Sequence, residues 1–180
     1  MRKLKTGCVH IYTGDGKGKT TASMGLALRA ASAGLSVCMF QFLKAKGSSV
    51  ENWLEFPNFR VVCLGHTHPM FLRSNAIREK TEIQLKKSIL KELRNIKCVM
   101  KTKKYDVIIL DEIVNCVSEG FIAEKEILGL IKAKPRPTEL VLTGRCAPKG
   151  LVDAADYVTK MEKIKHPFDS GLRCRKGIEY

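Results

Sequence analysis

Short apolar runs alternate with amphipathic segments along the whole chain, and this alternation predicts its secondary structure. Runs that are apolar throughout and rich in β-branched residues predict buried strands. These runs lie at residues 7–14, 35–42, 59–65, 105–113 and 138–144, and residues 156–164 are expected to form the last strand. Apolar residues at helical spacing predict helices at residues 19–33, 75–101 and 124–133. Gly34 follows the first of these helices, where glycine commonly ends a helix.

Apolar strands separated by helices are typical of a mostly parallel sheet with helices on both faces, so we expect an α/β fold. The 180 residues contain no internal repeat and no linker that would separate domains. We therefore expect one domain over residues 1–180. Ligands of such sheets bind at the carboxyl ends of the strands, so we expect the functional residues to lie there.

The stretch YTGDGKGKTTAS, residues 12–23, joins the first predicted strand to the first predicted helix. Residues 18–21 match the end of the phosphate-binding pattern G-x-x-x-x-G-K-[ST]. The beginning differs, because Thr13 stands where the pattern has its first glycine and Gly14 comes one position later. We expect this shift to change where a phosphate chain enters and leaves the loop.

The residue types of this loop fit a nucleotide phosphate. Glycines allow backbone N–H groups to crowd around an anion, and those of the loop are Gly14, Gly16 and Gly18. Lys17 and Lys19 bring positive charge, and the helix that follows brings the positive end of its dipole. A glycine-rich surface turn is the alternative, but it does not account for G-K-T-T at a strand–helix junction. The loop therefore predicts nucleotide binding.

An acidic motif, VIILDE at residues 107–112, supplies the second half of such a site. Its buried strand ends in Asp111 and Glu112. Carboxylates delivered beside a phosphate loop can hold Mg²⁺ directly or through water, and the hydroxyl of Thr20 can join them. Together the two motifs predict a P-loop nucleotide-binding domain without specifying a reaction.

Composition narrows the class of protein. No apolar run approaches the roughly 20 residues that cross a bilayer, and no apolar segment follows the basic residues at 1–6. We therefore expect a cytoplasmic protein without a membrane partner. The seven cysteines include no C-x-x-C pair, which favours free thiols over a zinc site or a disulfide framework.

The formal net charge of +14 favours an anionic ligand or partner: a nucleotide, a nucleic acid, an acidic protein or an acidic lipid surface. Many of the lysines crowd residues 86–104. These lysines form either a solvated helix face or a specific binding surface, and the sequence leaves both interpretations open.

Four stretches, TGDGKGKTTAS, IILDEI, ELVLTGRCAP and KHPFDSGLRCRKGIEY, occur in this order. With them the chain resembles the P-loop type of ATP:corrinoid adenosyltransferase from about residue 7 to its last residue. The resemblance implies a RecA-like fold, a homodimer, and ATP held in the loop in a reversed sense. It also implies transfer of the 5′-deoxyadenosyl group of ATP to the Co(I) centre of a reduced corrinoid. Triphosphate leaves, and adenosylcobalamin or its precursor forms.

The resemblance also assigns roles to residues. It implies that Thr20 and Glu112 contact Mg²⁺, with Asp111 adjacent. Co(I) is itself a strong nucleophile, so the chain's task is to stabilise the departing triphosphate, and the residues expected to act in catalysis are Lys19, Thr20 and Glu112. The implied ATP-binding residues are Gly14, Asp15, Gly16, Lys17, Gly18, Lys19, Thr20, Thr21 and Arg29.

The corrinoid side departs from the family pattern. Family members place aromatic residues after the third strand, where they remove the lower axial ligand of Co(II). His66 and His68 stand there in this chain, and Phe71 is a possible substitute. An imidazole can wedge beneath the corrin or coordinate cobalt; two loop histidines without a role are the alternative. The electrons come from a reduced flavoprotein in this family, and the basic excess suits an acidic flavodoxin-like partner.

Two other functions use the same fold and loop. A RecA-like nucleic-acid-dependent ATPase is compatible with the charge, but the chain lacks an evident aromatic stacking stripe, so we expect no nucleic-acid partner. A small-molecule kinase would need a lid and an acceptor site. It would release ADP rather than triphosphate, so product analysis separates these alternatives.

Overall fold

The computed structural model describes residues 4–44, 57–65, 75–175 and 177–178, and within residues 75–80 it describes the backbone alone. Here the strands form one sheet in the order β3-β2-β4-β5-β1-β6, and every pairing is parallel. The strands are β1 Val9–Thr13, β2 Val37–Gln41, β3 Phe59–Cys63, β4 Val107–Asp111, β5 Glu139–Thr143 and β6 Tyr157–Lys160. All carboxyl ends therefore meet at one edge.

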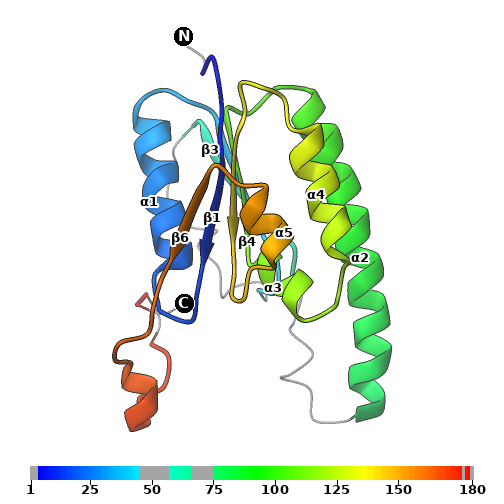
Figure 1. The fold of residues 1–180 in the computed structure, drawn as a ribbon, viewed down its shortest axis with the longest axis vertical. Coiled ribbons are helices and arrows are strands. Elements are labelled where there is room, and N and C mark those ends of the chain that lie inside the picture. The colour runs from blue at the N-terminus through cyan, green and yellow to red at the C-terminus, as the bar shows by residue number, and fades with distance from the viewer. Residues whose placement is uncertain (1–3, 45–56, 66–74, 176, 179–180) are drawn as a thin grey trace.

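Helices cover both faces of this sheet, as Figure 1 shows, with α1 on one face and α2 and α4 on the other. The helices are α1 Lys19–Ser32, α2 Asn75–Lys101, α3 Ile113–Ser118, α4 Glu124–Ala133, α5 Lys149–Asp153 and the short 3₁₀ helix η2 Pro167–Ser170. The predicted α/β fold is confirmed. Three of these elements, α3, α5 and η2, were not predicted.

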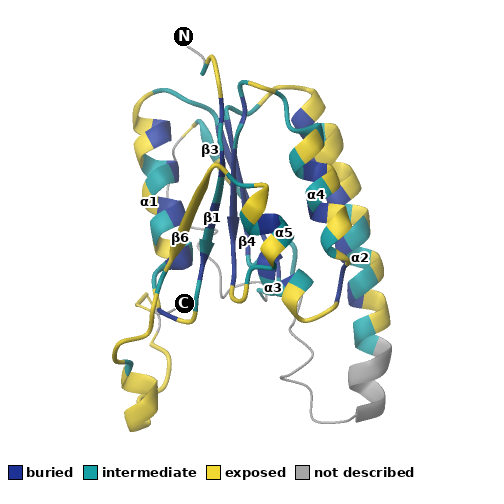
Figure 2. Cartoon of the chain, viewed as in Figure 1, coloured by how far each residue is buried: buried dark blue, intermediate teal, exposed yellow. Residues whose placement is uncertain are grey.

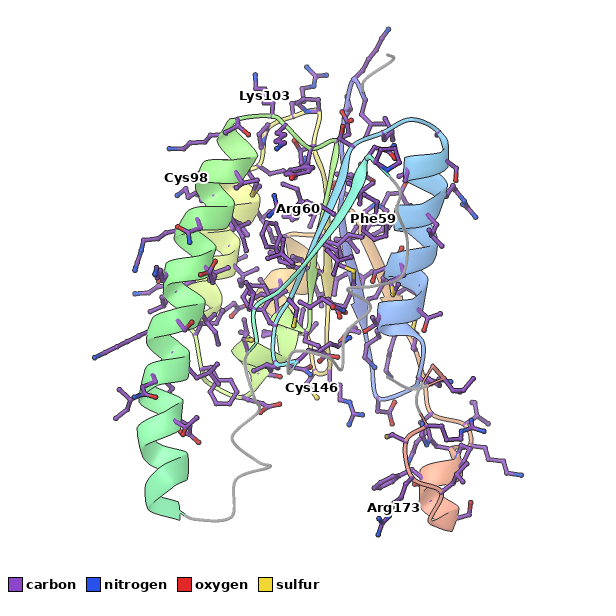
Figure 3. The ribbon with its side chains drawn as sticks, turned by 180° about the vertical axis from the view of Figure 1, so that it is seen from behind. Phe59, Arg60, Cys98, Lys103, Cys146 and Arg173 are labelled. Carbon is purple, nitrogen blue, oxygen red and sulfur yellow. The ribbon has the colours of Figure 1, made fainter. Side chains whose placement is uncertain are left out.

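Two apolar clusters hold the layers together. Successive residues of a strand point to opposite faces, and accordingly Ile108 of β4 belongs to the cluster with α2 and α4 while Ile109 belongs to the cluster with α1. The buried residues of α2 recur at helical spacing at Leu85, Ile89, Leu93, Ile96 and Met100. Strands β2, β4 and β5 are consequently the buried centre of the molecule, whereas the edge strand β6 is exposed (Figure 2).

The basic segment of α2 turns its charges to solvent. Lys87, Lys91, Arg94, Lys97 and Lys101 are all exposed, opposite the apolar stripe of the same helix. This arrangement agrees with the first of the two interpretations, a solvated helix face. None of the described helices is long and apolar enough to cross a membrane.

The segment that follows β6, residues 161–175 and here called the tail, continues past the carboxyl edge of the sheet (Figure 1). Its side chains are largely exposed (Figure 2). Even its large apolar residues face solvent: Ile164 is 91% and Phe168 68% exposed. The tail thus lies beside the edge where ligands of parallel sheets bind, with its apolar groups uncovered in the isolated chain.

Candidate active site

Three polar residues form a row at the carboxyl edge of the sheet, on the face covered by α1. Gln41 ends β2 and is paired with Asp111 at the end of β4, while Thr143 ends the neighbouring β5. All three are fully buried. Because polar groups are buried at a cost unless they are hydrogen-bonded, this row indicates a network rather than ordinary core.

Asp111 is the centre of that network. Its Oδ1 accepts hydrogen bonds from the hydroxyls of Thr20 at 2.8 Å and Thr143 at 2.7 Å. Its Oδ2 accepts from Gln41 Nε2 at 3.2 Å and from the ammonium of Lys44 at 2.8 Å. Four donors therefore surround one carboxylate with 0% exposure, so both of its oxygens are satisfied.

The phosphate loop is bound to the segment that follows β6. Met161 N donates to Thr13 O at 2.8 Å, and Gly16 N donates to Met161 O at 2.8 Å. Gly14 has φ +100°, and a Cβ there would lie 2.3 Å from Met161 O. Only glycine permits both the left-handed backbone and this close approach. The loop is therefore shaped by Met161, a residue far along the chain that directly follows β6.

Lys19 folds back into its own loop. Its ammonium donates to the backbone oxygens of Gly14 at 2.8 Å and Gly16 at 2.7 Å, and its side chain is nearly buried. Burial lowers the pKa of Lys19, and the positive charge of Arg145 lowers it further. An ammonium that is partly desolvated and held by neutral carbonyls is well placed to exchange them for an anion.

Glu112 adopts an uncommon conformation directly after β4. Its φ is +65°, in the left-handed region that non-glycine residues seldom occupy. The turn is held by a hydrogen bond from Glu112 N to Thr143 Oγ1 at 2.9 Å and by one from the Asn115 amide to the Glu112 carboxylate. Burial raises the pKa of Glu112, and the charge of Asp111 raises it further. Strained, electrostatically costly residues of this kind concentrate at functional sites.

The oxygens at this edge fit Mg²⁺, which prefers hard oxygen ligands. The Thr20 hydroxyl donates its hydrogen bond to Asp111, so its lone pairs remain for a metal ion, and a cation would relieve the cost of charging Glu112. In the described part of the chain no three His, Cys, Asp or Glu side chains are grouped to hold a metal. The missing ligands suit nucleotide phosphates, which commonly complete Mg²⁺ sites.

The structure brings together some of the predicted residues and separates others. Thr20 is hydrogen-bonded to Asp111, which Glu112 follows in the chain, and Asp15, Lys17 and Thr21 are exposed around the loop. Arg29 lies in the last turn of α1, and ten residues of helix place it roughly 15 Å along the axis from Lys19. The predicted corrinoid-side residues His66, His68 and Phe71 lie outside the described residues.

Sequence reasoning missed four participants: Gln41, Lys44, Thr143 and Met161. A usable signal existed for two of them. Gln41 and Thr143 are polar residues at the carboxyl ends of apolar strands, in VCMFQ and ELVLT. Because every such end lies at the ligand edge of a parallel sheet, both could have been proposed.

Comparison with solved structures places the fold. The chain is similar to the KaiC-like protein PH0186 from Pyrococcus horikoshii OT3, with a TM-score of 0.56 and 17% sequence identity, covering 92% of this chain and 84% of that one. At this identity the likeness concerns the fold alone, and it confirms the predicted RecA-like P-loop class.

Curated relatives match almost the full chain. Proteins named corrinoid adenosyltransferase are 31% identical over 175 residues in Sinorhizobium sp, 28% over 177 residues in Escherichia coli strain K12, and 30% over 179 residues in Pseudomonas aeruginosa. Each match covers 97% of this chain and, in that order, 80%, 86% and 84% of the relative. The model of the family described as ATP:corrinoid adenosyltransferase BtuR/CobO/CobP matches residues 5–180. The chain therefore belongs to the ATP:corrinoid adenosyltransferase family.

Proposed function

We propose that this enzyme transfers the 5′-deoxyadenosyl group of ATP to the Co(I) centre of a reduced corrinoid and releases triphosphate. The observation that carries the proposal is the hydrogen bond between Thr20 and Asp111, which lie 91 residues apart. It joins the phosphate loop to the acidic strand end and so assembles one nucleotide site. Membership of the family supports the identity of both substrates.

The reaction requires no covalent bond between a side chain and the substrate, because Co(I) is itself the nucleophile. The electron pair of Co(I) forms the Co–C bond at the 5′ carbon, and the electrons of the breaking C–O bond leave with the triphosphate. Negative charge therefore grows on the departing oxygen, and preorganised positive groups stabilise it. The Lys19 ammonium, already inside the loop, is the side chain best placed to do so.

The same residues account for a metal requirement. Thr20 and Glu112 would hold Mg²⁺ together with the phosphates, and Asp111 orients the Thr20 hydroxyl by accepting its hydrogen bond. When bound, Mg²⁺ supplies positive charge beside the leaving group. The remaining contacts of the loop to ATP come from Asp15, Lys17, Gly18 and Thr21. Arg29 contacts the nucleotide from farther along α1.

The proposed reversed sense of ATP finds support in the loop. Gly16 N, an amide that a phosphate loop would ordinarily turn to its anion, is already bonded to Met161 O. The triphosphate must then rely on other loop amides and on the first turn of α1, whose N–H groups have no acceptor within the helix. A different set of donors implies a different path for the phosphate chain.

Several finer features belong to the proposal. The enzyme acts as one domain over residues 1–180 and as a homodimer, for which exposed apolar side chains such as Tyr157 and Phe168 offer contact area. It works in the reducing cytoplasm, where its seven free cysteines are stable. His66, His68 and Phe71, which follow β3 in sequence, contact the corrinoid. An acidic flavodoxin-like reductant approaches the strongly basic surface.

Product analysis tests the proposed function. The protein is incubated with ATP, Mg²⁺ and chemically reduced cobalamin, and we expect a light-sensitive adenosyl product together with intact triphosphate. Release of ADP with a phosphorylated acceptor would identify a kinase instead. Phosphate release that requires DNA or RNA would identify a nucleic-acid-dependent ATPase.

A further inference from the structure

Lys44 places a positive charge at the carboxylate that supports the metal site. It lies three residues beyond the end of β2, and its ammonium is 2.8 Å from Asp111 Oδ2. The Lys44 side chain is 24% exposed, whereas Asp111 is fully buried. A buried carboxylate is costly without a charged partner, and within the described residues Lys44 is the cation that forms an ion pair with it.

The charges around this pair favour an anion over a free cation. Glu112 lies in the field of one carboxylate, Asp111, and of three cations, Lys44, Lys19 and Arg145. Glu112 thus has one negative and three positive neighbours, and Asp15, which acts on Lys19, is itself accompanied by Lys163 and Lys160. The electrostatic binding free energy of a divalent cation without a nucleotide is small at such a site, whereas that of a triphosphate chain is large. A metal ion bound to a triphosphate satisfies both the preference of the site for an anion and the need of Thr20 and Glu112 for a cation.

We propose that Lys44 is a positioning residue that serves as the resident counter-charge of Asp111, so that the nucleotide-free enzyme binds no divalent cation and the metal enters only together with ATP. Lys44 acts through Asp111, which in turn holds the hydroxyl of Thr20. The inference rests on the proposed function, because it assumes that Thr20 and Glu112 hold a nucleotide-borne metal.

Replacing the lysine tests this directly. Lys44→Met removes the charge and leaves an unbalanced carboxylate, while Lys44→Arg retains the charge. Lys101→Met, at the exposed end of α2, is the matched control. Mn²⁺ is titrated into nucleotide-free protein, and binding is measured by loss of the free-ion EPR signal.

We expect no specific Mn²⁺ binding by the wild type, Lys44→Arg or Lys101→Met. Lys44→Met should bind one Mn²⁺ with an affinity at least tenfold above the upper limit that the wild-type titration sets, and the double variant Lys44→Met/Asp111→Asn should lose this gain. One tightly bound Mn²⁺ per nucleotide-free wild-type chain would overturn the inference, and so would a folded Lys44→Met variant with wild-type behaviour. If Lys44→Met unfolds, we expect added Mn²⁺ to restore its fold, and a failure to do so would contradict the proposed role of Lys44.

A calorimetric titration of the wild type with ATP separates this inference from the function beneath it. We expect ATP to bind in the presence of Mg²⁺. If ATP does not bind with Mg²⁺ present, the proposed function fails. If it binds, but the nucleotide-free protein also takes up Mn²⁺, the role of Lys44 alone is refuted.

Discussion

Replacing Thr143 by valine removes one hydroxyl from the centre of the site and leaves its shape almost unchanged. That hydroxyl donates to Asp111 Oδ1 at 2.7 Å and accepts from Glu112 N at 2.9 Å. Thr143 itself is fully buried, so water cannot readily take its place. The substitution therefore leaves a charged acceptor short of one donor and a backbone donor short of its acceptor.

The magnitude follows from these two losses. A hydrogen bond to a charged group contributes about 1.5–3 kcal/mol, and leaving a buried donor unsatisfied costs about 1–3 kcal/mol. Because the two bonds share one network and their effects are not additive, we expect Thr143→Val to lower the free energy of unfolding by about 3 kcal/mol. With a urea slope of about 2 kcal/mol per molar, the unfolding midpoint should fall by about 1.5 M.

Urea unfolding followed by circular dichroism provides the measurement. Thr159→Val is the matched control, because Thr159 is exposed on β6 of the same sheet, and its effect should stay within about 0.5 kcal/mol. A loss below about 1 kcal/mol for Thr143→Val would refute the view that this buried hydroxyl holds the carboxylate row together.

Three further predictions concern the loop and its acidic partner. Lys19→Ala should lower turnover about 100-fold or more in a steady-state assay, because it removes a donor to the departing oxygen, and near-normal turnover would exclude that role. Gly14→Ala should lower the melting temperature and abolish ATP binding, because its Cβ meets Met161 O, whereas Gly25→Ala, which meets nothing within 4 Å in α1, should be neutral or stabilising. Glu112→Gln should raise the melting temperature at pH 7, because the raised pKa of Glu112 means that its charged form costs stability above its ordinary value of 4.5. That gain should vanish as the pH falls below 4.5; a gain of equal size at all pH values would contradict it.

Much of the fold could be predicted from apolar patterning, since a buried parallel strand must be apolar on both faces. The exceptions have physical causes. The expected strand 105–113 ends at Asp111 because Glu112 turns into the left-handed region and starts α3. No glycine or asparagine announces that turn; the contacts with Thr143 and Asn115, remote and local, impose it. α5 has five residues, too few for a periodic pattern to be visible.

The site was predictable to the extent that its motifs are local. The phosphate loop and the acidic strand end each occupy a short stretch, and the two motifs commonly occur together in P-loop nucleotide-binding domains. Lys44 has no such local signal, because its partner Asp111 is 67 residues away. Strand order decides that contact, and the order β2-β4 is not written in either segment alone.

The bond between Gly16 and Met161 bears on how the molecule is made. A ribosome delivers the chain from its N-terminus, so the glycine turn leaves the exit tunnel long before the residues that support it. β1 also cannot form its strand pairings until β5 and β6 have been synthesised, because both of its neighbours in the sheet come much later in the chain. Affinity for ATP should therefore arise only after residue 161 has left the exit tunnel, and nascent chains stalled before that residue should not be retained by immobilised nucleotide.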